Sequence, residues 1–259
     1  MNETVRSRNT TVDKALGILD LISAERLSLT AIEIANHLGA SRSTAYRYID
    51  TLVDLGFLQQ NLAGGFCLGH KIFELARLGS GTNKTLDLAS AWMSQLRAEF
   101  NETLTYTRRR NSTHTVIDAV EASQRLVRVG YTVGELMPIH AGAPSVVHLA
   151  KDTPDQIRAL MREVELTQFT DTTPRSVDDI LRSLDRLHTH GYYTSRGEKD
   201  AEAVSVAVPL YSPDHSRVLG GLGFIVPVNR FNLELEEAMA ARLISASDDI
   251  EARLNFYQP

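Results

Sequence analysis

The chain has 259 residues, roughly twice the commonest domain length of about 100–150, so it can build one or two hydrophobic cores. Its composition, 43% apolar and 23% charged, excludes an intrinsically disordered chain. No apolar run approaches the roughly 20 residues of a membrane-spanning helix, and no secretory signal stands at the polar start, so we expect a cytoplasmic protein. A net charge of −5 argues against DNA binding by the whole surface, although a small domain can carry its cations locally.

A cluster of turn residues divides the chain near residue 80. Residues 78–84 read Leu-Gly-Ser-Gly-Thr-Asn-Lys and follow a helical stretch. We therefore place the domain boundary at this cluster.

Three amphipathic helices are predicted in the first domain. Apolar residues recur at helical spacing over 12–22. Thr30 and Glu33 form a capping box that begins the second helix, and Gly39 supplies the left-handed residue that ends it. Ser41 can cap a third helix two residues later. Helix, short glycine turn and helix make the helix-turn-helix pattern.

A β-hairpin is predicted after the third helix, because two short runs flank the glycine-rich residues 61–65. The result is a winged helix-turn-helix. Its third helix begins with exposed polar residues, where such helices contact base edges and phosphates of double-stranded DNA. The candidate DNA-binding residues are Ser41, Arg42, Ser43, Thr44, Tyr46 and Arg47. A solvated helix face in a fold that binds no DNA would show the same pattern.

The second domain is predicted to be an antiparallel α+β fold. Helical spacing over 87–100 gives way to strand alternation over 103–107. Further strands are expected at 113–120, 125–129, 192–195, 203–210 and 218–226, and further helices at 143–150, 154–164, 177–190 and 233–254. Because the strands come in groups and do not alternate strictly with helices, we expect an antiparallel sheet with flanking helices.

Small residues on one face of the strand at 203–210 predict space above the sheet. Ala203, Ser205 and Ala207 share that face, and Ser205 could orient a ligand within it. Larger side chains from the helices filling that space are the alternative. The helix that begins near Ala143 is expected to present unpaired amides, which favour an anionic ligand.

Several ordered motifs carry a family resemblance along nearly the whole chain. They lie at residues 11–22, 29–47, 52–58, 137–141, 190–192, 206–210 and 219–226. Together they resemble the IclR family of bacterial transcriptional regulators. The resemblance implies a winged helix-turn-helix domain over residues 1–70 and a linker helix over 71–83 that helps dimerise. It also implies a GAF-like effector domain over 84–259 that binds a small organic or aromatic acid.

Effector-binding positions also follow from the resemblance. Carried over by position, it places them at Ala143, Pro144, Ser195 and Ser205. Glu198 lies in the loop between the last two of these, where it is either a hydrogen-bond acceptor or a solvated surface charge. Two hydroxyls stand where related pockets have an acid and a thiol, so the ligand can differ in polarity.

The wing departs from the family pattern, because it lacks the basic residue that commonly follows its glycine. Arg6 and Arg8 could compensate as a flexible arm on the DNA backbone. The function that the resemblance implies is a ligand-responsive repressor of a neighbouring catabolic operon. Its partners would be double-stranded operator DNA, a small-molecule effector and further copies of the chain, as a homodimer or a dimer of dimers.

We expect no metal, no cofactor and no catalytic residue. The histidines lack metal-ligand spacing, and there is no P-loop, dinucleotide fingerprint or nucleophile elbow. Two alternatives stay open. An enzyme with a helix-turn-helix regulatory head would turn its ligand over, and an interaction module with a collapsed pocket would bind no small acid.

Overall fold

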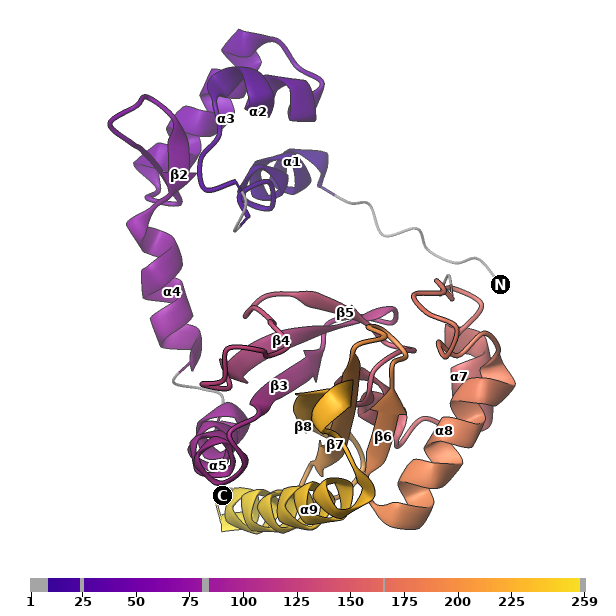
Figure 1. Cartoon of the computed structure of the whole chain (residues 1–259). Coiled ribbons are helices and arrows are strands. Elements are labelled where there is room, and N and C mark those ends of the chain that lie inside the picture. Colours follow the sequence, from indigo (N-terminus) through magenta and orange to yellow (C-terminus); the bar gives the residue numbers. More distant parts are fainter. Residues whose placement is uncertain (1–8, 24–25, 81–83, 165, 257–259) are drawn as a thin grey trace. The chain divides into compact units, whose positions relative to one another are not determined.

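The computed structural model describes residues 9–23, 26–80, 84–164 and 166–256 (Figure 1). The chain forms two compact units, divided between residues 82 and 83. Each unit has a hydrophobic core of its own.

The first unit is a small helical bundle with a β-hairpin. Its elements are α1 (Thr10–Leu19), α2 (Ala31–Leu38), α3 (Arg42–Asp54), β1 (Leu58–Gln60), β2 (Phe66–Leu68) and α4 (His70–Ser80). The two strands pair antiparallel, and a bridge from Leu29 to Phe66 widens the hairpin. Ile18, Ile34 and Ile49 bring α1, α2 and α3 together in one core.

The local helix signals of the sequence are confirmed in this unit. Thr30 and Glu33 form the predicted reciprocal capping box, and Ser41 caps α3 by accepting from the Thr44 amide. Gly39 ends α2 with a left-handed φ of 58°. The first helix is shorter than predicted, because it ends at Leu19.

The second unit is built on one six-stranded antiparallel sheet, so the predicted α+β fold is confirmed. Its strands are β3 (Thr103–Arg109), β4 (His114–Glu121), β5 (Leu136–Pro138), β6 (Tyr193–Arg196), β7 (Ala203–Tyr211) and β8 (Val218–Pro227). Its helices are α5 (Lys84–Phe100), α6 (Ala143–Val146), α7 (Pro154–Leu160), α8 (Val177–His190) and α9 (Leu233–Phe256), with 3-10 turns η1 (Val147–Leu149) and η2 (Val228–Arg230). The strand order is β5-β4-β3-β8-β7-β6.

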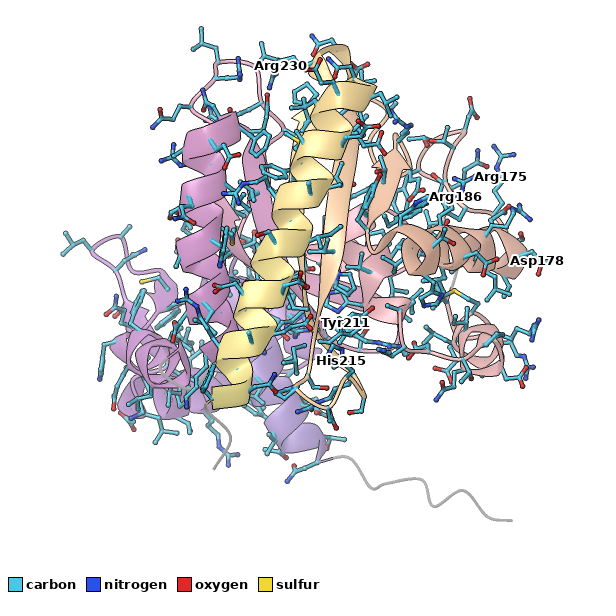
Figure 2. All side chains as sticks on the ribbon, turned by 90° about the horizontal axis from the view of Figure 1, so that it is seen from below. Arg175, Asp178, Arg186, Tyr211, His215 and Arg230 are labelled. Carbon is cyan, nitrogen blue, oxygen red and sulfur yellow. The ribbon has the colours of Figure 1, made fainter. Side chains whose placement is uncertain are left out.

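The two faces of this sheet pack against different helices. Val206, Val208 and Phe224 lie in a core with α5 and α9, which run side by side in Figure 2. Ala207 and Tyr193 lie in a second core with α6, η1, α7 and α8. The alternation of side chains along β7 therefore separates a closed structural face from the face that carries α6.

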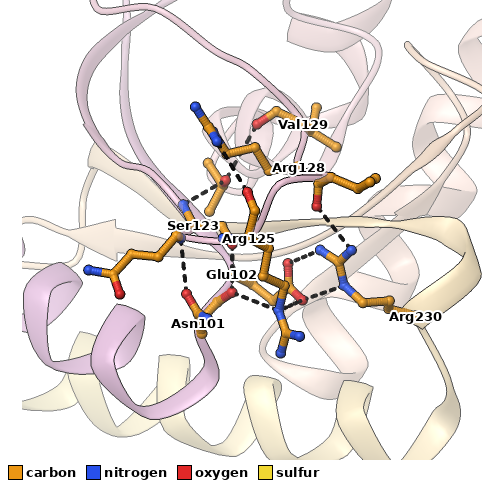
Figure 3. Close-up of polar contacts among 10 residues, drawn as sticks. Asn101, Glu102, Ser123, Arg125, Arg128, Val129 and Arg230 are labelled. Atoms are coloured by element: carbon orange, nitrogen blue, oxygen red, sulfur yellow. Dashed lines mark hydrogen bonds and ion pairs between the residues drawn. The ribbon is translucent and has the colours of Figure 1, made fainter.

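The strand predicted at 125–129 is absent, which corrects the sequence analysis. Those residues form a loop whose apolar Leu126 and Val127 are exposed. The loop is held by side chains, since both Arg125 and Arg230 pair with the buried carboxylate of Glu102 (Figure 3). Arg230 also donates to the Val127 carbonyl at 3.0 Å. These charge-assisted contacts replace the ladder hydrogen bonds of a strand.

Three other elements also differ from prediction. The edge strand β5 was not predicted, and it takes the place beside β4. The helix expected over 143–150 is a single turn of α6 followed by η1, and the helix expected over 154–164 ends at Leu160.

Candidate functional site

The first half of α3 exposes most of the residues predicted to bind DNA. Arg42, Ser43, Tyr46 and Arg47 are exposed, whereas Thr44 is half-buried. The Ser41 hydroxyl accepts from the Thr44 amide at 3.3 Å and lies 3.0 Å from the Ser43 and Thr44 hydroxyls. Ser41 and Thr44 thus hold the start of the helix, and the other four present hydrogen-bonding groups to solvent.

Free cations stand at the start of α3 and carboxylates at its end. Among the described residues, Arg42 and Arg47 have no acidic partner, whereas Arg26 is paired with a carboxylate of the second helix at 2.5 Å. Asp50 and Asp54 are exposed farther along α3. Because carboxylates repel phosphates, they confine the favourable region for DNA to the first half of the helix.

The wing carries no lysine or arginine over residues 58–68. Its turn is closed by Asn61, whose side-chain oxygen accepts from the Ala63 and Gly65 amides. Leu62, between Asn61 and Ala63 in the turn, is fully exposed. Arg6 and Arg8, predicted as a basic arm, lie outside the described residues.

The buried start of α6 is satisfied from within the protein. The Gly142 amide donates to Glu198 Oε2 at 3.0 Å, and the Ala143 amide donates to Ser205 Oγ at 3.0 Å. The prediction that the amides at the start of α6 are unpaired is therefore wrong. A buried amide without a partner costs about 1–3 kcal/mol, and two side chains distant in sequence remove that cost.

Glu198 is a buried acceptor and not a solvated surface charge. The Tyr193 hydroxyl donates to its other oxygen, and the Ser183 hydroxyl lies 2.9 Å from that of Tyr193. Burial raises the pKa of the Glu198 carboxyl, although hydrogen bonds from Tyr193, Gly142 and the Ser195 hydroxyl oppose the shift. The Glu198 carboxyl group thus lies at the N-terminal amides of α6, where the sequence predicts an anionic ligand.

Four of the five predicted effector residues line one small cavity. Pro144, Ser195, Glu198 and Ser205 surround about 20 Å³, and Ala143 contributes its amide to Ser205. Ser195 and Ser205 stand opposite each other in the pairing of β6 with β7. A space of this size holds about one water molecule, so a larger ligand must displace side chains around it.

Sequence reasoning missed the remaining polar and apolar lining, which includes Tyr131, Met137, Lys199 and Ile225. The Lys199 ammonium lies 3.0 Å from Glu135 Oε1 and 4.9 Å from the centre of the Tyr131 ring. Its position next to Glu198 in the sequence could have pointed to it. The sequence leaves open whether the space above the small residues of β7 is empty or filled by side chains from the helices. Over Ala207 it is filled by such side chains.

A layer of polar contacts fixes α6 on the sheet. The Thr107 hydroxyl donates to the Pro144 carbonyl at 2.7 Å and lies 3.0 Å from His148 Nε2. Burial lowers the pKa of His148 to about 3, so the imidazole is neutral. Gly221 lies beneath, where a Cβ atom would stand 2.7 Å from the Pro144 carbonyl oxygen. The close approach of α6 therefore depends on this glycine.

In the part of the chain that the structure describes, no three His, Cys, Asp or Glu side chains gather closely enough to hold a metal ion. Over the same residues, every helix is too short or too polar to cross a membrane.

Comparisons with known proteins agree for both units. The profile of the IclR helix-turn-helix domain matches residues 11–62, and that of the bacterial transcriptional regulator IclR C-terminal domain matches residues 83–252. The HTH-type transcriptional regulator XynR of Escherichia coli K12 is 27% identical over 221 residues, which cover 85% of this chain and 86% of XynR. The HTH-type transcriptional regulator KdgR of Dickeya chrysanthemi is 26% identical over 248 residues, 94% of this chain and 79% of KdgR.

Solved structures share the fold. An IclR homologue from Microbacterium hydrocarbonoxydans, crystallised with 4-hydroxybenzoate, has a TM-score of 0.84 at 22% identity, over 94% of this chain and 98% of its own. A regulator from Alicyclobacillus acidocaldarius also has a TM-score of 0.84, at 22% identity, over 95% of this chain and 99% of its own.

Proposed function

The chain belongs to the IclR family of bacterial transcriptional regulators, and from that premise we propose that it represses a neighbouring catabolic operon and releases the DNA when a small acid binds. In this proposal the first half of α3 reads the operator. The cavity beside α6 receives the effector.

The exposed guanidinium groups of Arg42 and Arg47 support operator binding. They stand at the N-terminal end of α3 without acidic partners among the described residues, and Ser43 and Tyr46 add uncharged hydrogen-bonding groups. Because Asp50 and Asp54 follow on the same helix, DNA contact is confined to about one and a half turns. In helix-turn-helix proteins the recognition helix contacts base edges in the major groove through its N-terminal residues, and in α3 these are the residues around Arg42 and Arg47.

Assembly into dimers is part of the proposal. One small winged helix covers few base pairs, so a pseudo-palindromic site read by two copies gives a more useful specificity. Phe73, Leu75 and Leu78 of α4 expose apolar side chains, with Phe73 67% exposed, and a second copy would cover them. Light scattering at micromolar concentration should find a dimer or a tetramer, and a monomer with and without DNA would contradict it.

The effector that the cavity favours is a small hydroxylated or aromatic acid, or a neutral relative. Ser195 and Ser205 supply hydroxyls, and Lys199, whose ammonium would be shared between Glu135 and the ligand, supplies a cation for a carboxylate. The buried Glu198 disfavours a carboxylate at the α6 amides, so the acid group would face Lys199. The related regulator that was crystallised with 4-hydroxybenzoate makes hydroxybenzoates the first compounds to test.

The observation that carries the proposal is the meeting of Ser195, Glu198 and Ser205 at one cavity. Operator binding is measured by fluorescence anisotropy at fixed salt, with and without 4-hydroxybenzoate and related small acids. Ser205→Phe fills the cavity, so it should abolish the response to the acid and leave operator affinity unchanged. Ser205→Val, which removes the hydroxyl at smaller volume, repeats the test if the larger side chain perturbs folding.

Two results would contradict the proposal. A full ligand response in both Ser205 variants would mean that the effector binds elsewhere. Consumption of the acid during the titration would favour the alternative of an enzyme with a regulatory head.

A further inference from the structure

Two hollows, named the outer hollows here, lie between α8, β6 and the residues that precede α8. They share part of their lining. Each measures about 410 Å³. Four residues line both hollows: Thr172, Arg186, Tyr193 and Glu198. Volumes of this order fit small metabolites.

Arg186 is the cation of these hollows that lacks a partner. The other three arginines that line them are each paired with a carboxylate: Arg175 with Asp171, Arg182 with Asp179, and Arg196 with Glu236. Among the described residues, Arg186 makes neither a hydrogen bond nor an ion pair. It is exposed on α8, and Figure 2 shows it on the same side of the helix as Arg175.

The outer hollows and the inner cavity share one carboxyl group. Glu198 lines all three. One of its oxygens accepts from Tyr193, which faces the outer hollows, and the other accepts from the Gly142 amide at the inner cavity. Burial is the main cause of the raised pKa of both Glu198 and Tyr193, and the charge of Arg186 opposes it as the smallest cause. The carboxyl group that holds α6 therefore lies at the wall of the hollows that contain Arg186.

We propose that the hollows around Arg186 form a second, outer site for a small anion that carries carboxylate or phosphate oxygens. The guanidinium binds two such oxygens in one plane, a geometry that favours these groups over spherical anions. The His190 and Thr172 side chains at the rim add further polar contacts. Because Glu198 lines both the outer hollows and the inner cavity, an anion in the outer site lies close to the carboxyl group that holds α6.

The site is tested with succinate and inorganic phosphate, titrated by calorimetry into the full-length protein without DNA. Ionic strength is held constant with sodium chloride. We expect saturable binding of at least one of the two, weakened about tenfold or more in Arg186→Gln, since a charge-assisted bidentate contact is lost. Arg158→Gln, an exposed arginine of α7 that is paired with Asp155, loses the same charge elsewhere and should stay within about twofold of the wild type.

A second variant has the opposite expected sign. Glu198→Gln removes the nearby negative charge, so the same anions should bind more tightly, by roughly two- to fivefold. Absence of saturable binding by both anions, or equal affinity in Arg186→Gln and the wild type, would overturn the proposal. These titrations contain neither DNA nor 4-hydroxybenzoate, so the outer site can fail while the proposed effector site stands, and the reverse.

Discussion

Two helix starts in this protein use the same backbone chemistry in opposite surroundings. The start of α3 is exposed and is capped by Ser41, which is adjacent to it in sequence. The start of α6 is buried and is capped by Glu198 and Ser205, which lie 56 and 62 residues away. The exposed start leaves its arginines free to contact a partner. The buried start is part of the core, so binding there is coupled to the packing of the domain.

Because the start of α6 is part of the core, we expect substitutions in the sheet beneath α6 to reduce stability more than any other change considered. Gly221→Ala places a Cβ atom against the Pro144 carbonyl and should lower the free energy of unfolding by about 3 kcal/mol. Urea unfolding followed by the fluorescence of Trp92, the single tryptophan, reports on the second unit. Gly130→Ala, where a Cβ atom meets nothing within 4 Å, is the matched control. If Gly221→Ala and Gly130→Ala lower the free energy of unfolding equally, α6 does not pack closely against Gly221.

The exposed start should respond in binding and not in stability. Arg47→Ala is expected to weaken operator binding by roughly 1–3 kcal/mol in anisotropy titrations at fixed salt. The unfolding transition of the first unit, followed by circular dichroism, should stay where it is in the wild type. Arg158→Ala, in the second unit, tests whether loss of any surface arginine has the same effect. An unchanged operator affinity in Arg47→Ala would remove the support for α3 as the reading helix.

The two capping serines allow a direct comparison of an exposed and a buried cap. Ser205→Ala leaves the Ala143 amide buried without a partner and should cost about 1.5 kcal/mol. Ser41→Ala leaves its amide open to water and should cost about 1 kcal/mol in the first unit, measured by circular dichroism. A larger loss from Ser41→Ala would contradict the contrast between the two starts.

The smallest expected effect is a dependence on pH. Burial raises the pKa of Glu198 above its ordinary value of 4.5, so the folded state favours the protonated carboxyl. The stability that this group contributes is present at low pH and is lost as the pH rises through the raised pKa. Glu198→Gln stays neutral, so its stability relative to the wild type should increase as the pH rises from about 4.5 towards neutrality. A constant difference across that range would mean that Glu198 is not perturbed.

The contrast between the two helix starts also explains which features could be predicted from the sequence and which could not. The capping box at Thr30, the cap at Ser41 and the left-handed Gly39 each depend on residues a few positions apart, so local patterns predicted them. The partners of α6 depend on the register of β6 against β7, which no local pattern contains. Glu198 was therefore named as a candidate, but its burial could not be derived.

The misassigned strand at 125–129 has a related cause. Its apolar residues Leu126, Val127 and Val129 have strand propensity, but Arg230 reaches this segment from a position more than a hundred residues later and satisfies a backbone carbonyl. Tertiary contacts of this kind override propensity. The order of strands, with β3 between β4 and β8, lay beyond sequence patterns for the same reason.

The place of β3 beside β8 also has a consequence during synthesis. Thr103 pairs with Ile225, so the centre of the sheet cannot close until the ribosome has released most of the chain. The contacts of the first unit lie within its first 82 residues and can form much earlier. A nascent chain can thus acquire its helix-turn-helix unit before the second unit closes, and an interrupted translation product would carry the first without the second.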